Sequence, residues 1–184
     1  MPTNVKIDRG VAFDGDAIVQ GGIKDYVLLI NKDDLDNGAI VEDGVSGEIE
    51  TITLDSGTYA YKIESSKGSA QIIPSSPLRV VSAIDGFDHT IDIRILDVSQ
   101  LSVDNIKKMR FQKVVAIVPL TSGKFLLYGR RVGMRISDFQ MNPGDADTGG
   151  TLQVVLKTPD NDSPEIDPPH VIESTFNVLS LLQS

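Results

Sequence analysis

The clearest pattern in the chain is a strand-like alternation of apolar and polar residues between positions 88 and 159. Residues 90–98 place Ile91, Ile93 and Ile95 on one side and mostly charged residues on the other, which is the period-2 pattern of a half-buried strand. Residues 114–120 are apolar or small at nearly every position and predict a central strand covered on both faces. Both patterns indicate a β-sheet that supports a real core.

A single helical stretch interrupts this run of strands. Ser102 is predicted to cap a helix over about 102–111, with Asp104 in the first turn and basic residues near the end, an order that suits the helix dipole. Ile106 and Met109 lie at helical spacing, so we expect them to pack on the sheet.

Turn-forming residues divide the first half of the chain. The segment KDDLDNG at 32–38 favours a turn, and residues 72–81 contain Pro74 and Pro77, which cannot donate ladder hydrogen bonds and therefore predict a loop. Further strands are predicted at 5–7, 26–31, 47–54, 58–65 and 70–73.

The second half predicts a long hairpin. Residues 125–128 continue as strand through 132–136, and the loop NPGDADTGG at 142–150 joins them to a partner strand at 152–157. The hairpin thus spans 125–158.

These elements predict a mainly β chain: an antiparallel β-sandwich or small barrel flanked by one short α-helix, with extended arms. We divide it into an N-terminal arm (1–22), a β-sandwich domain (23–158) and an extended C-terminal arm (159–184). Residues 159–169 are rich in Pro, Asp and Asn and lack periodicity, which is typical of a linker. The apolar residues after the linker either bind a neighbouring subunit or fold back on their own domain. If they bind a neighbour, the contact residues would be Phe176, Leu179 and Leu182.

The composition argues against several classes of function. The chain has 184 residues, 26 acidic and 17 basic, for a formal net charge of −9, which disfavours tight nucleic-acid binding. It has no Cys, which excludes disulfides and thiolate zinc sites and fits a reducing cytosol. No run approaches the roughly 18 apolar residues of a membrane span, so we expect a soluble protein with no membrane partner.

The motifs that carry chemistry are weak. The string Asp147-Thr148-Gly149 matches aspartic proteases, but it lies in a predicted loop and not after an apolar strand, so an acidic turn is the better interpretation. His89 and His170 lack metal-ligand spacing, although His89, beside Asp88, could serve as an acid or base. Neither acidic cluster fits an EF-hand loop; the candidate calcium ligands are Asp33, Asp34 and Asp36 in one and Asp145 and Asp147 in the other. We therefore expect no catalytic residue, no cofactor and no metal.

A basic stretch stands out within the acidic chain. Arg130, Arg131 and Arg135 could form an interface with acidic residues such as Asp145 and Asp147 of another copy. The alternative is an exposed strand face with local ion pairs of little energetic weight.

The order of segments resembles structural proteins of tailed bacteriophages of Bacteroidetes-type hosts, in particular a tail-tube or neck-ring subunit. The segments that carry the resemblance are GGIKDYVLLIN, HTIDIRILDVS, NIKKM, KVVAIVPL, KFLLYG, VGMRIS, GDADTGG, LQVVLKTP and PPHVI. The resemblance covers about residues 21–172, and FNVLSLLQS lies beyond it, which would also suit a baseplate position.

The resemblance implies a non-catalytic virion protein, made in the bacterial host cytoplasm, that self-assembles into a ring, commonly hexameric. Its inner sheets would line a channel through which DNA passes as non-specific cargo, and its other partners would be tail, neck or baseplate proteins. A β-sandwich module that binds a carbohydrate or protein ligand is the alternative, although aromatic residues make up only 5% of the chain. A hydrolase with unrecognised carboxylate chemistry is a third.

Overall fold

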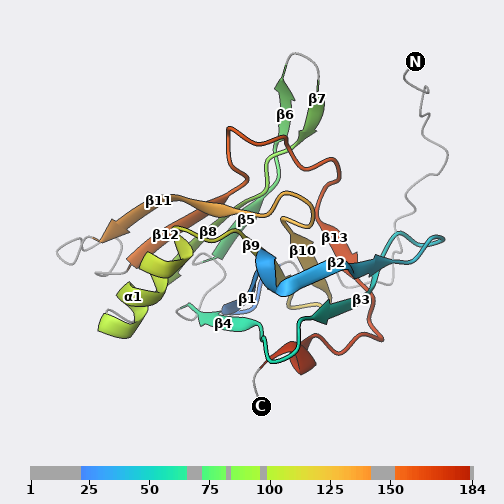
Figure 1. The fold of residues 1–184 in the computed structure, drawn as a ribbon, viewed down its shortest axis with the longest axis horizontal. Helices are drawn as coiled ribbons and strands as arrows, with labels where there is room; N and C mark the ends of the chain where they lie inside the picture. The colour runs from blue at the N-terminus through green and yellow to red at the C-terminus, as the bar shows by residue number, and fades with distance from the viewer. Residues whose placement is uncertain (1–21, 66–71, 82–83, 96–98, 142–151, 183–184) are drawn as a thin grey trace.

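Over the described residues, the fold is a mainly β sandwich with one α-helix, as the sequence predicts. The computed structural model describes residues 22–65, 72–81, 84–95, 99–141 and 152–182. A seven-stranded sheet has the order β2-β3-β13-β10-β9-β1-β4, a four-stranded sheet has the order β11-β12-β8-β5, and β6 and β7 form a separate hairpin (Figure 1). The strands are β1 Tyr26–Asn31, β2 Leu35–Glu42, β3 Ile49–Leu54, β4 Tyr61–Glu64, β5 Ile72–Ser75, β6 Leu78–Val81, β7 Ile84–Phe87, β8 Thr90–Ile95, β9 Val114–Pro119, β10 Phe125–Tyr128, β11 Arg135–Met141, β12 Leu152–Lys157 and β13 His170–Ile172, and the helix is α1 Gln100–Met109.

The central strands of the seven-stranded sheet are buried on both faces. In β1, Val27 and Leu29 belong to one hydrophobic core, whereas Leu28 and Ile30 belong to another. Every residue of β9 is buried, which confirms the predicted central strand at 114–120. Because successive side chains of a strand point to opposite faces, one sheet supports two separate cores.

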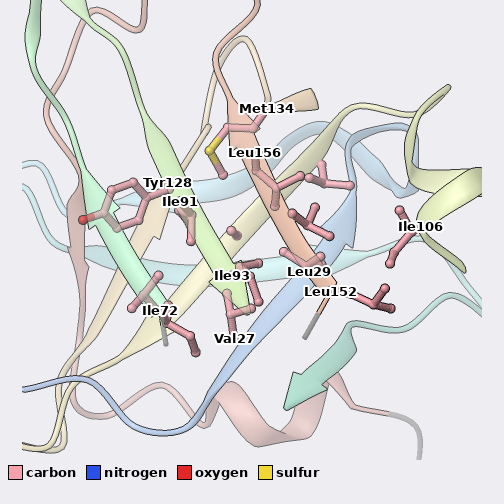
Figure 2. Close-up of a cluster of buried hydrophobic side chains, with 14 residues drawn as sticks. Val27, Leu29, Ile72, Ile91, Ile93, Ile106, Tyr128, Met134, Leu152 and Leu156 are labelled. Atoms are coloured by element: carbon pink, nitrogen blue, oxygen red, sulfur yellow. The ribbon is translucent and has the colours of Figure 1, made fainter. Parts of the chain in front are cut away.

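The first core lies between the two sheets and under α1. Figure 2 shows its side chains pointing toward one another from both sheets and from the helix. Its buried members are Val27, Leu29, Ile72, Ile91, Ile93, Ile106, Val114, Ala116, Val118, Tyr128, Met134, Leu152, Val154 and Leu156.

The second core lies on the opposite face of the seven-stranded sheet, and the C-terminal part of the chain closes it. A short 3-10 helix, Val178–Leu181, buries Val178 and Leu181 there, and β13 lies between β3 and β10 in the sheet. The described part of the segment predicted to be a C-terminal arm therefore folds back on its own domain.

Helix α1 begins two residues earlier than predicted, and its cap was assigned wrongly. Ser99, and not Ser102, is the N-cap: its backbone is extended, and its hydroxyl accepts a hydrogen bond from the Ser102 N–H at 3.2 Å. The prediction for the inner face is confirmed, because Ile106 is buried and Met109 is partly buried against the first core.

Two predicted interruptions are partly strand. The turn at 32–38 is confined to a 3-10 turn at Lys32–Asp34, and β2 begins at Leu35. The predicted loop at 72–81 contains β5 and β6. Pro74 is tolerated because β5 is the last strand of its sheet, where one row of backbone groups needs no partner.

The predicted long hairpin is divided between two sheets. The 152–157 strand pairs with β11 as expected, but β10 pairs with β9 and β13 in the other sheet. A turn over residues 129–133 separates β10 from β11, so the prediction of one continuous strand from 125 to 136 is wrong. The predicted strand at 5–7 and the loop at 142–150 lie outside the described residues.

Candidate functional site

The turn at 129–133, Gly-Arg-Arg-Val-Gly, carries the chain from one sheet to the other. Gly129 and Gly133 have φ angles of 71° and 79°, in the left-handed region that favours glycine. The turn directs the N–H groups of the last three residues, Arg131 to Gly133, toward a single point. Successive N–H groups arranged in this way form a concave site for an anion.

The side chain of Glu165 occupies this site. Its carboxylate accepts hydrogen bonds from the N–H of Arg131 at 3.1 and 3.2 Å, of Val132 at 2.8 Å and of Gly133 at 3.3 Å. Glu165 is only 2% exposed, and its backbone pairs with Phe87 through hydrogen bonds of 2.7 and 3.1 Å. The predicted linker is therefore attached to the sandwich by a buried carboxylate.

His89 lies in the same polar cluster. Its Nδ1 accepts a hydrogen bond from the Gly129 N–H at 2.8 Å, so the proton resides on Nε2, which faces the Asp167 carbonyl oxygen at 3.2 Å. Burial lowers the pKa of His89, which keeps the ring neutral. The ring packs edge-on against Tyr128, whose pKa burial raises to about 12. Both nitrogens of His89 thus hold backbone segments in place, and neither faces a free acid or base position.

Ion pairs extend the cluster toward the hairpin and the linker. Arg79 in β6 lies 2.9 Å from Asp88 and donates to the backbone carbonyl of Asp162 at 3.1 Å. Lys113 lies 2.9 Å from the Asp162 carboxylate, and this hydrogen bond lowers the pKa of Asp162. These contacts tie Asp162 in the linker to the β6–β7 hairpin and to the start of β9.

A second group of charges surrounds Arg130 of the same turn. The ammonium of Lys32 donates to the Arg130 carbonyl oxygen at 2.6 Å, and burial lowers the pKa of Lys32. Arg130 forms an ion pair with Glu42, and the hydrogen bond from Arg130 holds the pKa of Glu42 below its usual value. Arg130 is therefore engaged within its own chain.

The residues predicted as an interface occupy three different settings. Arg130 and Arg131 lie in the turn, and Arg135 is exposed at the start of β11. Phe176 and Leu182 pack against the second core, whereas Leu179 is 53% exposed. Asp145 and Asp147 lie outside the described residues. Contact of any of these residues with a second copy stays a prediction.

Exposed apolar residues gather elsewhere, on the β6–β7 hairpin. This hairpin projects from the two sheets (Figure 1), and Leu78 and Val80 on its β6 strand are 62% and 70% exposed. Gly86 lies on β7, opposite Arg79, and its backbone packs directly on Pro164 and Glu165. One face of the hairpin thus packs on the linker, and the face with Leu78 and Val80 is exposed. The sequence analysis missed this surface because it placed residues 72–81 in a loop.

Two adjoining hollows lie between α1 and β4, which is the last strand of the seven-stranded sheet. They measure about 540 and about 470 Å³ and share Ile63, Asn105 and Met109 in their walls. Core residues of β8 and β12, including Ile93 and Val154, line the smaller one. This mainly apolar groove suits side chains of an apolar ligand or peptide.

Within the described ranges, no group of three or more His, Cys, Asp or Glu side chains is arranged to hold a metal ion. Of the candidate calcium ligands there, Asp34 accepts a hydrogen bond from the Asn31 side chain at 2.8 Å. No helix in the described part of the chain is long and apolar enough to cross a membrane.

Glu165 was the main residue that sequence reasoning missed. The two glycines of the 129–133 turn were a usable signal, because glycines four residues apart mark breaks in a strand. Nothing in the pattern of the linker distinguished Glu165 from its neighbours. Comparison with known proteins adds no assignment: no family model, curated protein or solved structure matches the chain.

Proposed function

We propose that the chain is a structural subunit of a phage tail tube or neck ring, which self-assembles into a ring around a channel for DNA. The observation that carries the proposal is the combination of a sandwich whose sheets have open edges with a projecting hairpin that exposes Leu78 and Val80. The order of sequence segments described above supports the same assignment.

Open sheet edges favour association. In the described residues, β2 and β4 end the larger sheet, and β5 and β11 end the smaller one. Each edge presents a row of backbone groups that another strand can pair with, and contacts between neighbouring copies in a ring can cover such edges. An apolar hairpin face adds buried area at a contact between neighbouring copies.

The charge of the chain fits a channel wall. A formal net charge of −9 repels the phosphate backbone, so DNA passes such a wall without being retained. This part of the proposal concerns DNA only as cargo.

The test is assembly of the purified full-length protein. We expect light scattering after size-exclusion chromatography to show a rising molar mass with concentration, and electron microscopy of the same fractions to show rings or stacked tubes with an open channel. Val80→Asp should weaken assembly through the hairpin. Val45→Asp is the matched control, because Val45 is also exposed (82%) but lies outside the hairpin, in the turn between β2 and β3, and should leave assembly unchanged. A protein that stays monomeric at every concentration would contradict the proposal.

A further inference from the structure

The free edge of β4 presents a defined set of backbone groups. The Ser65 N–H donates to the Asp25 carbonyl at 2.9 Å, which fixes the phase of the antiparallel ladder between β4 and β1. Because hydrogen-bonded pairs alternate along such a ladder, Tyr61 and Ile63 bond to β1, and the N–H and C=O groups of Lys62 and Glu64 point away from the sheet.

This edge already pairs with backbone from elsewhere in the chain at one end, where the 3-10 helix Val178–Leu181 ends. The Ala60 N–H donates to the Leu181 carbonyl at 2.8 Å, and Ala60 forms a parallel bridge with Leu182. Among the described residues, no strand lies beside Lys62 and Glu64. The edge therefore has room for a strand of about the length of β4.

The groove next to α1 would take the side chains of such a strand. Tyr61 and Ile63 point to the side of the sheet that α1 covers, and both line the hollows there. Residues of an added strand opposite these two would face the same hollows, whose walls include Ile95, Ile106 and Met109. Alternate residues of the occupant should therefore be apolar.

The chain itself contains a segment of this kind. Residues 1–21 precede the described part, and Val5-Lys6-Ile7-Asp8 alternates apolar and charged side chains. From Ile7 to Gly22 an extended chain spans about 50 Å, which exceeds the diameter of about 40 Å expected for a compact domain of this length. The segment is long enough to reach a neighbouring copy.

We propose that the β4 edge and the adjoining groove bind residues 1–21 of a second copy, which adds a strand through residues 5–8. This inference rests on the proposed assembly function and assigns one contact within it. Main-chain hydrogen bonds to Lys62 and Glu64 would supply affinity, and the apolar hollows would select Val5 and Ile7.

The test uses cross-linking of full-length variants, which is direct because the chain has no Cys. Asp8→Cys protein is mixed with Glu64→Cys protein and treated with a bis-maleimide, whose length tolerates a shift of one or two residues in register. Asp8 would lie on the side of the added strand that the Glu64 side chain faces, so this pair leaves Val5 and Ile7 intact. The side chain of Glu64 is 69% exposed, so the thiol is accessible. We expect a cross-linked heterodimer in several-fold higher yield than for Asp8→Cys mixed with the control Val45→Cys.

A proline at the edge separates backbone pairing from side-chain effects. Lys62→Pro, added to the Glu64→Cys protein, removes an outward N–H without affecting the hydrogen bonds to β1, and should abolish the cross-link. The control Lys62→Ala keeps this N–H and should retain the cross-link. Thermal unfolding of both variants checks that they fold.

Three results would overturn the inference: equal cross-linking to Val45→Cys, no cross-linking at all, or cross-linking only within single chains of an Asp8→Cys/Glu64→Cys variant. Failure of the assembly proposal is distinguishable. Rings without this cross-link leave assembly intact and refute the β4 contact, whereas cross-linked pairs without rings support the contact and refute the tube.

Discussion

Glu165 offers the sharpest test of the polar cluster. Its carboxylate accepts hydrogen bonds from three backbone N–H groups at 2.8–3.3 Å, within a site where it is 2% exposed. Glu165→Ala removes the acceptor of all three. Each unsatisfied buried donor costs about 1–3 kcal/mol, and water that enters the vacated space offsets part of the combined cost of the three donors. We therefore expect a loss of about 3–5 kcal/mol in the free energy of unfolding.

Glu165→Gln should cost less, about 1–2 kcal/mol. The amide keeps one oxygen acceptor but replaces the other with an NH₂ group that faces the Arg131 N–H, and the charge that strengthens these hydrogen bonds is lost. A loss of 3–5 kcal/mol would be a large fraction of the roughly 5–15 kcal/mol that stabilises a typical domain.

Urea denaturation followed by circular dichroism at neutral pH measures both values. Glu50→Ala, at an exposed position in β3, is the matched control and should change stability by less than about 0.5 kcal/mol. A loss of less than about 1 kcal/mol for Glu165→Ala, or equal destabilisation of the Gln and Ala variants, would show that the carboxylate does not have this role.

Three further predictions test neighbouring parts of the structure. Leu181→Ala should cost about 2–4 kcal/mol in chemical denaturation because Leu181 fills the second core, whereas Leu179→Ala, at an exposed site two residues earlier, should cost less than about 0.5 kcal/mol; equal effects would contradict the packing of the C-terminal segment. Gly86→Ala would place a Cβ 2.4 Å from the Glu165 carbonyl oxygen and should lower the melting temperature, whereas Gly44→Ala, with nothing within 4 Å, should not. Burial lowers the folded-state pKa of His89, so the unfolded chain takes up a proton first as the pH falls below about 6.5, and the free energy of unfolding should decrease there. The variant His89→Asn keeps an oxygen that can accept the hydrogen bond from the Gly129 N–H. It should lose this part of the pH dependence in thermal melts between about pH 5 and 7.

Local patterns were sufficient for the elements whose burial is set by neighbours in sequence. The strand at 26–31 was predicted with its observed bounds, and the alternation of Ile91 and Ile93 gave the buried face of β8. The inner face of α1 followed from helical spacing, although the choice of cap between two serines three residues apart did not. Both residues are serines with the same capping chemistry, so the backbone geometry of the preceding chain decides which of them is the N-cap.

The polar cluster could not be predicted, because its members are far apart along the chain. The hydrogen bonds of Glu165 reach residues 32 to 34 positions away, and that from Gly129 to His89 spans 40 positions. A buried charge is stable only where several donors converge on it, and that convergence exists only after the two sheets have packed.

The amino-acid sequence by itself determined the mainly β class, helix α1 and the central strand, because the apolar periods of strands and helices are visible in neighbouring residues. Only the tertiary structure decided which sheet each strand joins, and that the C-terminal segment is part of the domain. The linker carries few apolar residues and no period, so its place depends on partners in distant strands: the N–H groups of the 129–133 turn for Glu165 and the second core for Val178 and Leu181. Such partners come together only when the whole chain packs, and that packing cannot be predicted from the residues next to each partner in the sequence.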